Sequence, residues 1–351
     1  MPDPALLFVQ QINIILCFNS QVNTQLKTKT QLMAEQSLFK VLLMTVIAAS
    51  AEPELQDPKD EFVPNVCRHF SMIFHLNSST TSSSTTSGQL VGSEGLSSMS
   101  QSSSHSNLIE LDPLIFLDAL VDLLAAENRA HAKAALDAMN IFVETLLFLA
   151  SCKQTTQSSG GTPGAPMMVT SPPMISVLTP PPGVHIPVFE QLLPRLLHCC
   201  YGSTWQAQMG GVMGFGTLVG KVTIETLCLF QVRAIRSLVF VLRRLPQHAN
   251  KEKAETSQVL YRFLRVVNSA DEENRERHRQ SFQEVVIFFA TELFNPNTTL
   301  IVRKTVRSCL ALLTAQRGIE VSDLLEPLYQ SLWEPLLMHP LLSKDIEQQV
   351  L

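Results

Sequence analysis

Five glycines between residues 210 and 220 are the first residues whose type and spacing suggest chemistry, because glycine-rich segments next to helices can bind phosphate groups. The last three are Gly214, Gly216 and Gly220, and their G-x-G-x-x-x-G spacing differs from the dinucleotide-binding pattern. No Lys-Ser or Lys-Thr pair follows them, as it would in a P-loop, and no strand-like segment precedes them. The segment therefore favours close packing of helices through small residues over a nucleotide site.

Histidine and cysteine come together at one place, His198-Cys199-Cys200. Neighbouring residues of a helix point about 100° apart, so these three side chains do not converge on one metal ion. None of the nine histidines has H-E-x-x-H spacing, and none of the seven cysteines has C-x-x-C spacing. Most cysteines lie in apolar helical patterns, which indicates reduced core thiols of an intracellular protein. We expect no metal site and no cofactor.

Serine and threonine are abundant, but they concentrate in tracts where no histidine or acid is held beside them, as a nucleophile requires. No catalytic-loop or metal-binding motif of a kinase is present either. We therefore expect a protein that is not an enzyme.

Four arginines, which we call the arginine face, are the candidate partner-binding residues: Arg233, Arg236, Arg243 and Arg244. At about 100° per residue they fall within one third of a helix circumference, opposite Ile235, Leu238 and Leu242. They either form a solvated face that pairs with acids of the adjacent helix, or they bind acidic segments of a partner. Glu273 and Arg277, by contrast, are expected to satisfy each other at a spacing of four residues.

The elements that must position these side chains are helices. Apolar residues recur every three to four positions over residues 31–50, 61–76, 114–126, 130–150, 251–269, 271–294, 300–316 and 324–338, and more weakly over 6–18. No strand-like alternation is sustained. Helix pairs recur at roughly 40–48 residues, the length expected of HEAT units, so we expect an all-α protein with an α-solenoid of HEAT-like helix pairs.

The clearest helix-pair pattern spans residues 186–246. Pro194 lies inside its first helix, where it removes a backbone hydrogen bond and should bend the helix, at a cost of roughly 3 kcal/mol unless packing offsets it. Ser203 and Gln206 have the capping-box spacing before a second helix, and residues 223–245 form a longer third. Other helix ends are predicted at Asp112-Pro113 (N-cap), Ser269 with Glu272 (capping box) and Gly318 (C-terminal cap).

Two segments interrupt this pattern. Residues 77–107 are rich in serine and threonine, and residues 153–185 are rich in glycine, proline, serine and threonine. Such segments bury too little surface to offset their ordering entropy. The chain is therefore expected to divide into N-terminal helices (1–76), a disordered insertion (77–107), a helix pair (108–152), a second disordered insertion (153–185) and HEAT-like repeats (186–351).

The net charge of −5 over 351 residues provides no basic surface for nucleic acid. The longest apolar runs, such as residues 41–49, reach about half of the 18 or more residues that a membrane span needs. The first 20 residues contain Asp3 and no basic start, and Gln10 and Gln11 interrupt their apolar stretch, which argues against a secretory signal. We expect no nucleic-acid partner and no membrane.

Several runs of the chain are similar to one known family. They are PVFEQLLPRLL (187–197), HCCY (198–201), WQAQMGGVMG (205–214), LCLFQVR (227–233), DPKDEFV (57–63), LDPLIFLDAL (111–120), HAKAAL (131–136) and ELFNPN (292–297). These runs resemble the HEAT-repeat region of the family of the transformation/transcription domain-associated protein, over most of residues 34–351. Residues 1–33 do not share the resemblance to the same degree.

The resemblance implies a non-catalytic scaffold of nuclear histone acetyltransferase complexes, with transcription activators and other complex subunits as partners. Members of this family are very large and end in a kinase-like domain that has lost catalysis. No counterpart of that domain is found here, so a slice of a longer solenoid, or a truncated product, is expected. A nuclear-transport receptor, which is also a HEAT solenoid, and a fragment of a kinase-family enzyme are the alternatives.

Overall fold

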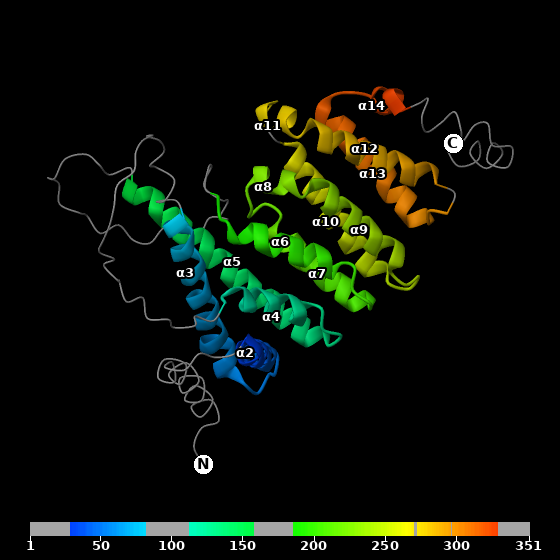
Figure 1. Cartoon of the computed structure of the whole chain (residues 1–351). Coiled ribbons are helices and arrows are strands. Elements are labelled where there is room, and N and C mark those ends of the chain that lie inside the picture. Colours follow the sequence, from blue (N-terminus) through cyan, green and yellow to red (C-terminus); the bar gives the residue numbers. More distant parts are fainter. Residues whose placement is uncertain (1–28, 82–111, 158–184, 270–271, 296, 329–351) are drawn as a thin grey trace, which may run out of the picture.

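The computed structural model describes residues 29–81, 112–157, 185–269, 272–295 and 297–328 (Figure 1). Within these ranges every regular element is helical. The α-helices are α2 (Lys29–Ala49), α3 (Val63–Thr81), α4 (Leu114–Leu124), α5 (Arg129–Gln157), α6 (Val188–Cys199), α7 (Trp205–Leu218), α8 (Ile224–Leu229), α9 (Gln231–Arg244), α10 (Asn250–Asn268), α11 (Glu272–Arg277), α12 (Arg279–Phe294), α13 (Leu300–Arg317) and α14 (Val321–Leu325). A π-helical turn (Pro58–Phe62) precedes α3, and a 3₁₀ turn (Glu326–Leu328) follows α14.

The helices stack as two parallel layers (Figure 1). One layer runs α2, α4, α6, α9, α12 and the other α3, α5, α7, α10, α13, and each helix contacts the next member of its own layer. Contacts between α4 and α5, α6 and α7, α9 and α10, and α12 and α13 join the layers into antiparallel pairs. This is the architecture of an α-solenoid, and it confirms the expected all-α solenoid of HEAT-like pairs.

One apolar core runs the length of the stack, from Leu43 in α2 to Leu313 in α13. Aromatic rings join helices within it: Phe70 of α3 stacks on Phe116 of α4, in the next pair, with ring centroids 4.4 Å apart. Within that pair, Phe116 meets Phe142 of α5 edge to face at 5.2 Å. Burial of such side chains contributes roughly 2–3 kcal/mol each and is the main force that holds pair to pair. The described helices therefore form one continuous array.

The predicted helix ends at residues 112–113 and at Gly318 agree with the structure to within one residue. Pro113, one residue after the predicted Asp112, is the N-cap of α4, although Asp112 Oδ1 accepts a hydrogen bond from the Leu114 N–H at 2.9 Å and so satisfies one free donor of the helix start. Gly318 ends α13 with φ +66°, the left-handed conformation that glycine adopts without strain. The α6 helix continues through Pro194, and Leu193 and Leu197 beside it are fully buried, so packing offsets the lost hydrogen bond.

Both predicted capping boxes are wrong. Thr204, one residue after Ser203, is the N-cap of α7, and its hydroxyl accepts from the Ala207 N–H at 3.3 Å. Ser269 ends α10 instead of starting the next helix, and its hydroxyl donates to the Val266 carbonyl at 2.7 Å. Adjacent residues with hydroxyl groups compete for one N-cap position, and a serine can cap either end of a helix. Residue spacing alone therefore does not decide which residue is the N-cap.

Helix lengths also differ from the prediction. The apolar stretch 223–245 divides at Phe230 into α8 and α9, and the stretch 271–294 divides at His278 into α11 and α12. The α3 helix extends past residue 76 to Thr81, and α5 extends past residue 152 to Gln157. Serine, threonine and glutamine only weakly disfavour a helix, so a buried helix can continue into them. The rest of both predicted disordered insertions, residues 6–18 and residues after 328 lie outside the described ranges.

The α5 helix has one further property. Its segment Arg129–Cys152 is long and apolar enough to cross a membrane by length and composition, a test that core helices of soluble proteins also pass. In this structure α5 packs against α3, α4 and α7, and Phe142, Leu146 and Leu147 are buried in the common core. Its apolar character is explained by its position between neighbouring helix pairs.

Candidate partner-binding surface

The four residues of the arginine face are all exposed on α9, while Ile235, Leu238 and Leu242 are buried on the opposite side of the helix. The predicted orientation of the helix is confirmed. The arginines nevertheless divide into two kinds by what their side chains contact.

Arg243 is bound to the next helix of its layer. Its Nη2 donates to Glu292 Oε2 of α12 at 2.5 Å, and the Glu292 side chain is only 9 % exposed. The same carboxylate oxygen accepts from Thr298 Oγ1 at 3.1 Å. A buried carboxylate needs such partners because its desolvation is costly when it is left unpaired. Arg243 therefore helps to hold α9 against α12.

Arg236 also faces α12, where its guanidinium lies over the Phe288 ring at 5.9 Å from the centroid. A cation over an aromatic face at this distance is attracted by the ring, by about 0.5–1 kcal/mol at an exposed position. Arg233 and Arg244, in contrast, make no ion pair and no ring contact with any described residue. These two are the arginines whose charge remains available to a partner.

Aromatic residues that no sequence pattern had indicated extend this surface. The Tyr201 ring, 44 % exposed, packs on Phe240 with centroids 4.7 Å apart, and Ser237 Oγ hydrogen-bonds its hydroxyl at 3.3 Å. Phe240 follows Arg236 by four residues on α9, and exposed Ile287 precedes Phe288 on α12. The Tyr201 and Phe240 rings thus lie beside Arg236 on α9, and arginine together with aromatic rings is enriched where proteins bind partners.

A groove of about 540 Å³ lies at the carboxyl end of α9. It is lined by Arg243 and Arg244 together with Glu127, Ser203, Thr204, Trp205, Gln206, Gln208 and Pro246. Trp205 carries the Arg129 guanidinium over its ring at 5.3 Å, and Arg129 pairs with Glu252 at 3.0 Å. The first turn of α7 opens on this groove, so its N–H groups add to the positive charge of Arg244. One acid, Glu127, opposes them.

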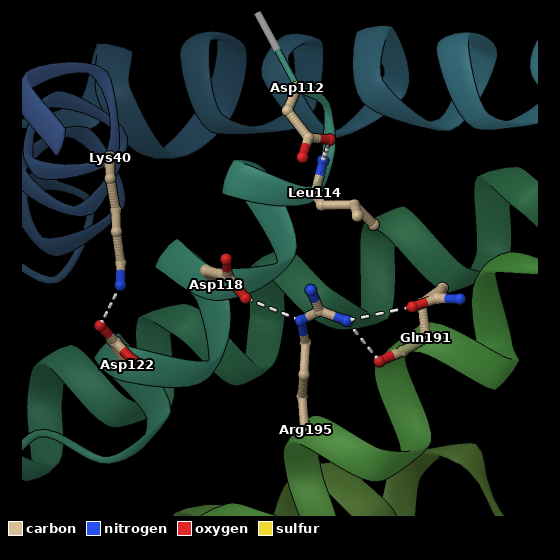
Figure 2. A network of polar contacts seen from close by, with 7 residues as sticks. All are labelled: Lys40, Asp112, Leu114, Asp118, Asp122, Gln191 and Arg195. Carbon is tan, nitrogen blue, oxygen red and sulfur yellow. Dashed lines mark hydrogen bonds and ion pairs between the residues drawn. The ribbon is translucent and has the colours of Figure 1, made fainter. Parts of the chain in front are cut away.

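Ion pairs between successive helices recur elsewhere in the same layer (Figure 2). Lys40 of α2 pairs with Asp122 of α4 at 2.5 Å, and Asp118 of α4 pairs with Arg195 of α6 at 2.7 Å. Arg195 also donates to the Gln191 carbonyl at 2.9 Å. The Arg243–Glu292 pair is the equivalent link between α9 and α12, so it belongs to the way the layer stacks.

The four glycines of α7 serve packing, as predicted, but the prediction is wrong for Gly220, which follows the helix with φ +89° and has no atom within 4 Å of a Cβ position. A Cβ atom on Gly210 would lie 2.0 Å from the Leu124 carbonyl oxygen of α4, and one on Gly211 would lie 2.7 Å from the Leu196 carbonyl oxygen of α6. Only glycine permits backbones to approach so closely. The segment lies inside a helix between two others, which leaves no loop that could surround a phosphate.

The three residues His198, Cys199 and Cys200 do not face one site, because His198 is exposed while both cysteines are buried. Burial raises the pKa of the Cys199 thiol to about 11 and raises that of Cys200 further. The described residues contain no group of histidine, cysteine and acid that could hold a metal. Core positions are confirmed for Cys67, Cys199, Cys200, Cys228 and Cys309; Cys152 is exposed, and Cys17 lies outside the described ranges.

Glu273 and Arg277 form the predicted pair, with Oε1 and Nη2 2.8 Å apart. Arg277 also reaches Glu225 of α8 at 3.5 Å. The pair therefore links α11 to α8 as well as stabilising its own helix, although both carboxylates are largely exposed and the contribution is small.

Comparison with known proteins places residues 9–350 in the family described as the Tra1 HEAT repeat ring region. The match begins at residue 9, well before residue 34, from which the resemblance was expected to extend. The human transformation/transcription domain-associated protein is 23% identical over 226 residues, which cover 62% of this chain and 5% of that protein. The SAGA complex/NuA4 acetyltransferase complex subunit TRA1 of Saccharomyces cerevisiae is 24% identical over 162 residues, covering 46% of this chain and 4% of the yeast protein. The chain thus spans about one twentieth of the length of these relatives.

Proposed function

Because the chain belongs to the Tra1 HEAT repeat ring family, we propose that it is a non-catalytic part of a protein-interaction scaffold in a nuclear histone acetyltransferase complex. The yeast relative is named as a subunit of the SAGA complex and the NuA4 acetyltransferase complex, and the human relative is named for transcription. A solenoid suits this role, since stacked helix pairs expose long surfaces on which partner segments can lie.

The partners that we propose for this segment are acidic activator segments and subunits of the complex. The observation that carries this proposal is that Arg233 and Arg244 remain unpaired with described residues, on the same helix on which Arg236 and Arg243 are engaged by α12. An acidic segment with aromatic or aliphatic side chains would place its carboxylates on Arg233 and Arg244. Its apolar side chains would lie on the rings of Tyr201 and Phe240.

The test is association of a fluorescent acidic activation peptide with the chain and with the double variant Arg233→Glu/Arg244→Glu. Because exposed charges steer encounter, we expect association at low salt to slow roughly tenfold or more in the variant, and the wild-type rate to fall steeply with salt. Arg262→Glu is the matched control, since Arg262 is an exposed arginine of α10 in the other layer. Equal association rates for the wild type and the double variant would contradict this surface as the docking site.

A complementary measurement is co-purification of acetyltransferase subunits with the chain in nuclear extract. The scaffold proposal predicts that the double variant retains these subunits as well, because they are expected to bind surfaces of this chain other than the arginine face. Their absence from both samples would contradict assembly through this segment.

A further inference from the structure

A small cavity of about 20 Å³ lies away from the arginine face, where the carboxyl ends of α10 and α13 meet α11 and the starts of α9 and α12. Six of the residues that line it matter here: Gln231, Asn268, Arg275, His278, Phe282 and Arg317. Gln231 and Asn268 are buried, and the six side chains come from the five helices α9 to α13 and from the junction between α11 and α12. The cavity is therefore built by the fold and does not belong to one flexible loop.

Two guanidinium groups share this cavity. Arg275 Nη2 donates to the Asn268 carbonyl oxygen at 3.2 Å, and Arg317 Nε donates to Asn268 Oδ1 at 3.1 Å. The Arg317 guanidinium carbon also lies over the Phe282 ring, 3.4 Å from the centroid. These contacts hold both cations at one residue. Burial lowers the pKa of Arg317, and the neighbouring positive charge of Arg275 lowers it further because the two cations repel each other.

Three carboxylates of α8 and α11 pair with other arginines. Glu225 and Glu273 both pair with Arg277, at 3.5 and 2.8 Å, and Glu276 pairs with Arg279 at 3.3 Å. Neither Arg275 nor Arg317 has an ion pair with a described residue. The carboxyl end of α10 offsets part of their charge, as helix ends do for cations, but a helix end carries only about half an elementary charge.

We propose that Arg275 and Arg317 form a binding site for a phosphoryl group, which enters the cavity with one oxygen atom and leaves the others at its mouth. The volume is close to that needed by a single water-sized atom, so a whole phosphate does not fit inside. Two arginine side chains from different helices offer more N–H donors, in more directions, than one carboxylate can accept. His278 and Gln231 supply further polar groups at the wall. The phosphoryl group comes either from free phosphate or from a phosphorylated serine or threonine of a partner segment.

The test uses the whole chain and measures its Tm in sodium phosphate against sodium chloride at matched ionic strength and pH. Inorganic phosphate at about ten times its Kd is expected to raise the Tm by about 2 °C. Arg275→Gln should abolish this rise, because it removes one of the two cations. Without phosphate its Tm should equal or exceed that of the wild type, since the repulsion at Arg317 is relieved. Arg262→Gln, an exposed arginine elsewhere on α10, should keep the full phosphate effect.

Three results would overturn the site. They are no phosphate effect in the wild type, the same effect in Arg275→Gln, or a Tm of Arg275→Gln that is lowered equally in both salts, which is the behaviour of a residue that only caps α10. An equal rise in sodium acetate would overturn the preference for phosphoryl over carboxyl groups. A phosphoserine tripeptide that raises the Tm more than inorganic phosphate does, with no effect of its unphosphorylated form, identifies a phosphorylated segment as the source. Inorganic phosphate acting alone identifies free phosphate.

Discussion

Helices α7 and α9 are each 14 residues long and contact each other, yet they interact with their neighbours in opposite ways. The α7 helix lies between α4 and α6 and meets them through glycine, where any side chain would collide with backbone atoms. The α9 helix meets α12 through long side chains, Arg236 and Arg243, that extend across the gap. The contacts of α7 with α4 and α6 depend on the absence of side chains, and the contact of α9 with α12 depends on charged side chains. We therefore expect α7 to tolerate substitution poorly and α9 to tolerate it according to what each arginine contacts.

The largest effect is expected at Gly210. Alanine there would place its Cβ 2.0 Å from the Leu124 carbonyl oxygen, and backbone on both sides prevents relief, so Gly210→Ala should lower the free energy of unfolding by about 3 kcal/mol or more. Gly216→Ala is the control, because its Cβ meets only the Val259 side chain at 2.9 Å, which can rotate, and we expect about 1 kcal/mol. Urea unfolding followed by circular dichroism measures both. Equal losses would show that the close approach at Gly210 is not what the helix requires.

The second effect concerns the buried carboxylate of Glu292. Arg243→Met leaves it with Thr298 as its hydrogen-bond partner, which should cost about 2 kcal/mol, less than for a fully buried pair because Arg243 is 40 % exposed. The double variant Arg243→Met/Glu292→Gln should recover about half of the loss, since the amide carries no charge and still accepts from Thr298. A double-mutant cycle with no coupling between the two positions would contradict a stabilising role for this pair.

Arg236 is expected to matter less. Arg236→Ala removes the contact with Phe288 and should cost about 0.5–1 kcal/mol. Arg236→Lys keeps the charge and should lose less than the alanine variant, whereas a loss of equal size for both would indicate that planarity of the guanidinium is needed. Reversing Arg236 and Arg243 together to glutamate would face Glu292 with like charge, so that variant is expected to unfold more easily even if partner binding is unaffected.

The smallest effect on stability is expected for Arg233 and Arg244. Arg233→Gln/Arg244→Gln should change the free energy of unfolding by less than about 0.5 kcal/mol, because neither side chain pairs with a described residue. The same variant should still weaken association with an acidic peptide. A clear loss of stability would show that Arg233 and Arg244 also make stabilising contacts, as Arg236 and Arg243 do. The distinction between the two kinds of arginine would then be wrong.

Much of the fold could be read from the sequence, because the information is local. Helix periodicity depends on residues three or four apart, so the apolar stripes predicted the helices, the buried side of α9 and the core position of Cys67. The spacing of the glycines does not match a phosphate-binding pattern, and from this we correctly predicted that the glycines of α7 allow close packing of helices. Local rules erred where two local solutions compete, as at Ser203 and Thr204, and where a long apolar run divides, as at Phe230 and His278. They also ended α3 and α5 too early, because both helices continue into polar residues.

What each residue contacts was decided by the tertiary structure. Arg243 and Glu292 are 49 residues apart, Arg195 and Asp118 are 77 apart, and both pairs meet because stacking brings equivalent positions of successive helices together. Glu292 lies in an apolar run, and nothing near it in sequence names its partner. Likewise, Gly210 and Leu124 come from separate helix pairs. Sequence patterns predict which face of a helix is apolar. The offset at which one helix stacks on the next depends on side-chain shape along the whole interface. That offset decides that Arg236 and Arg243 contact α12 while Arg233 and Arg244 pair with no described residue.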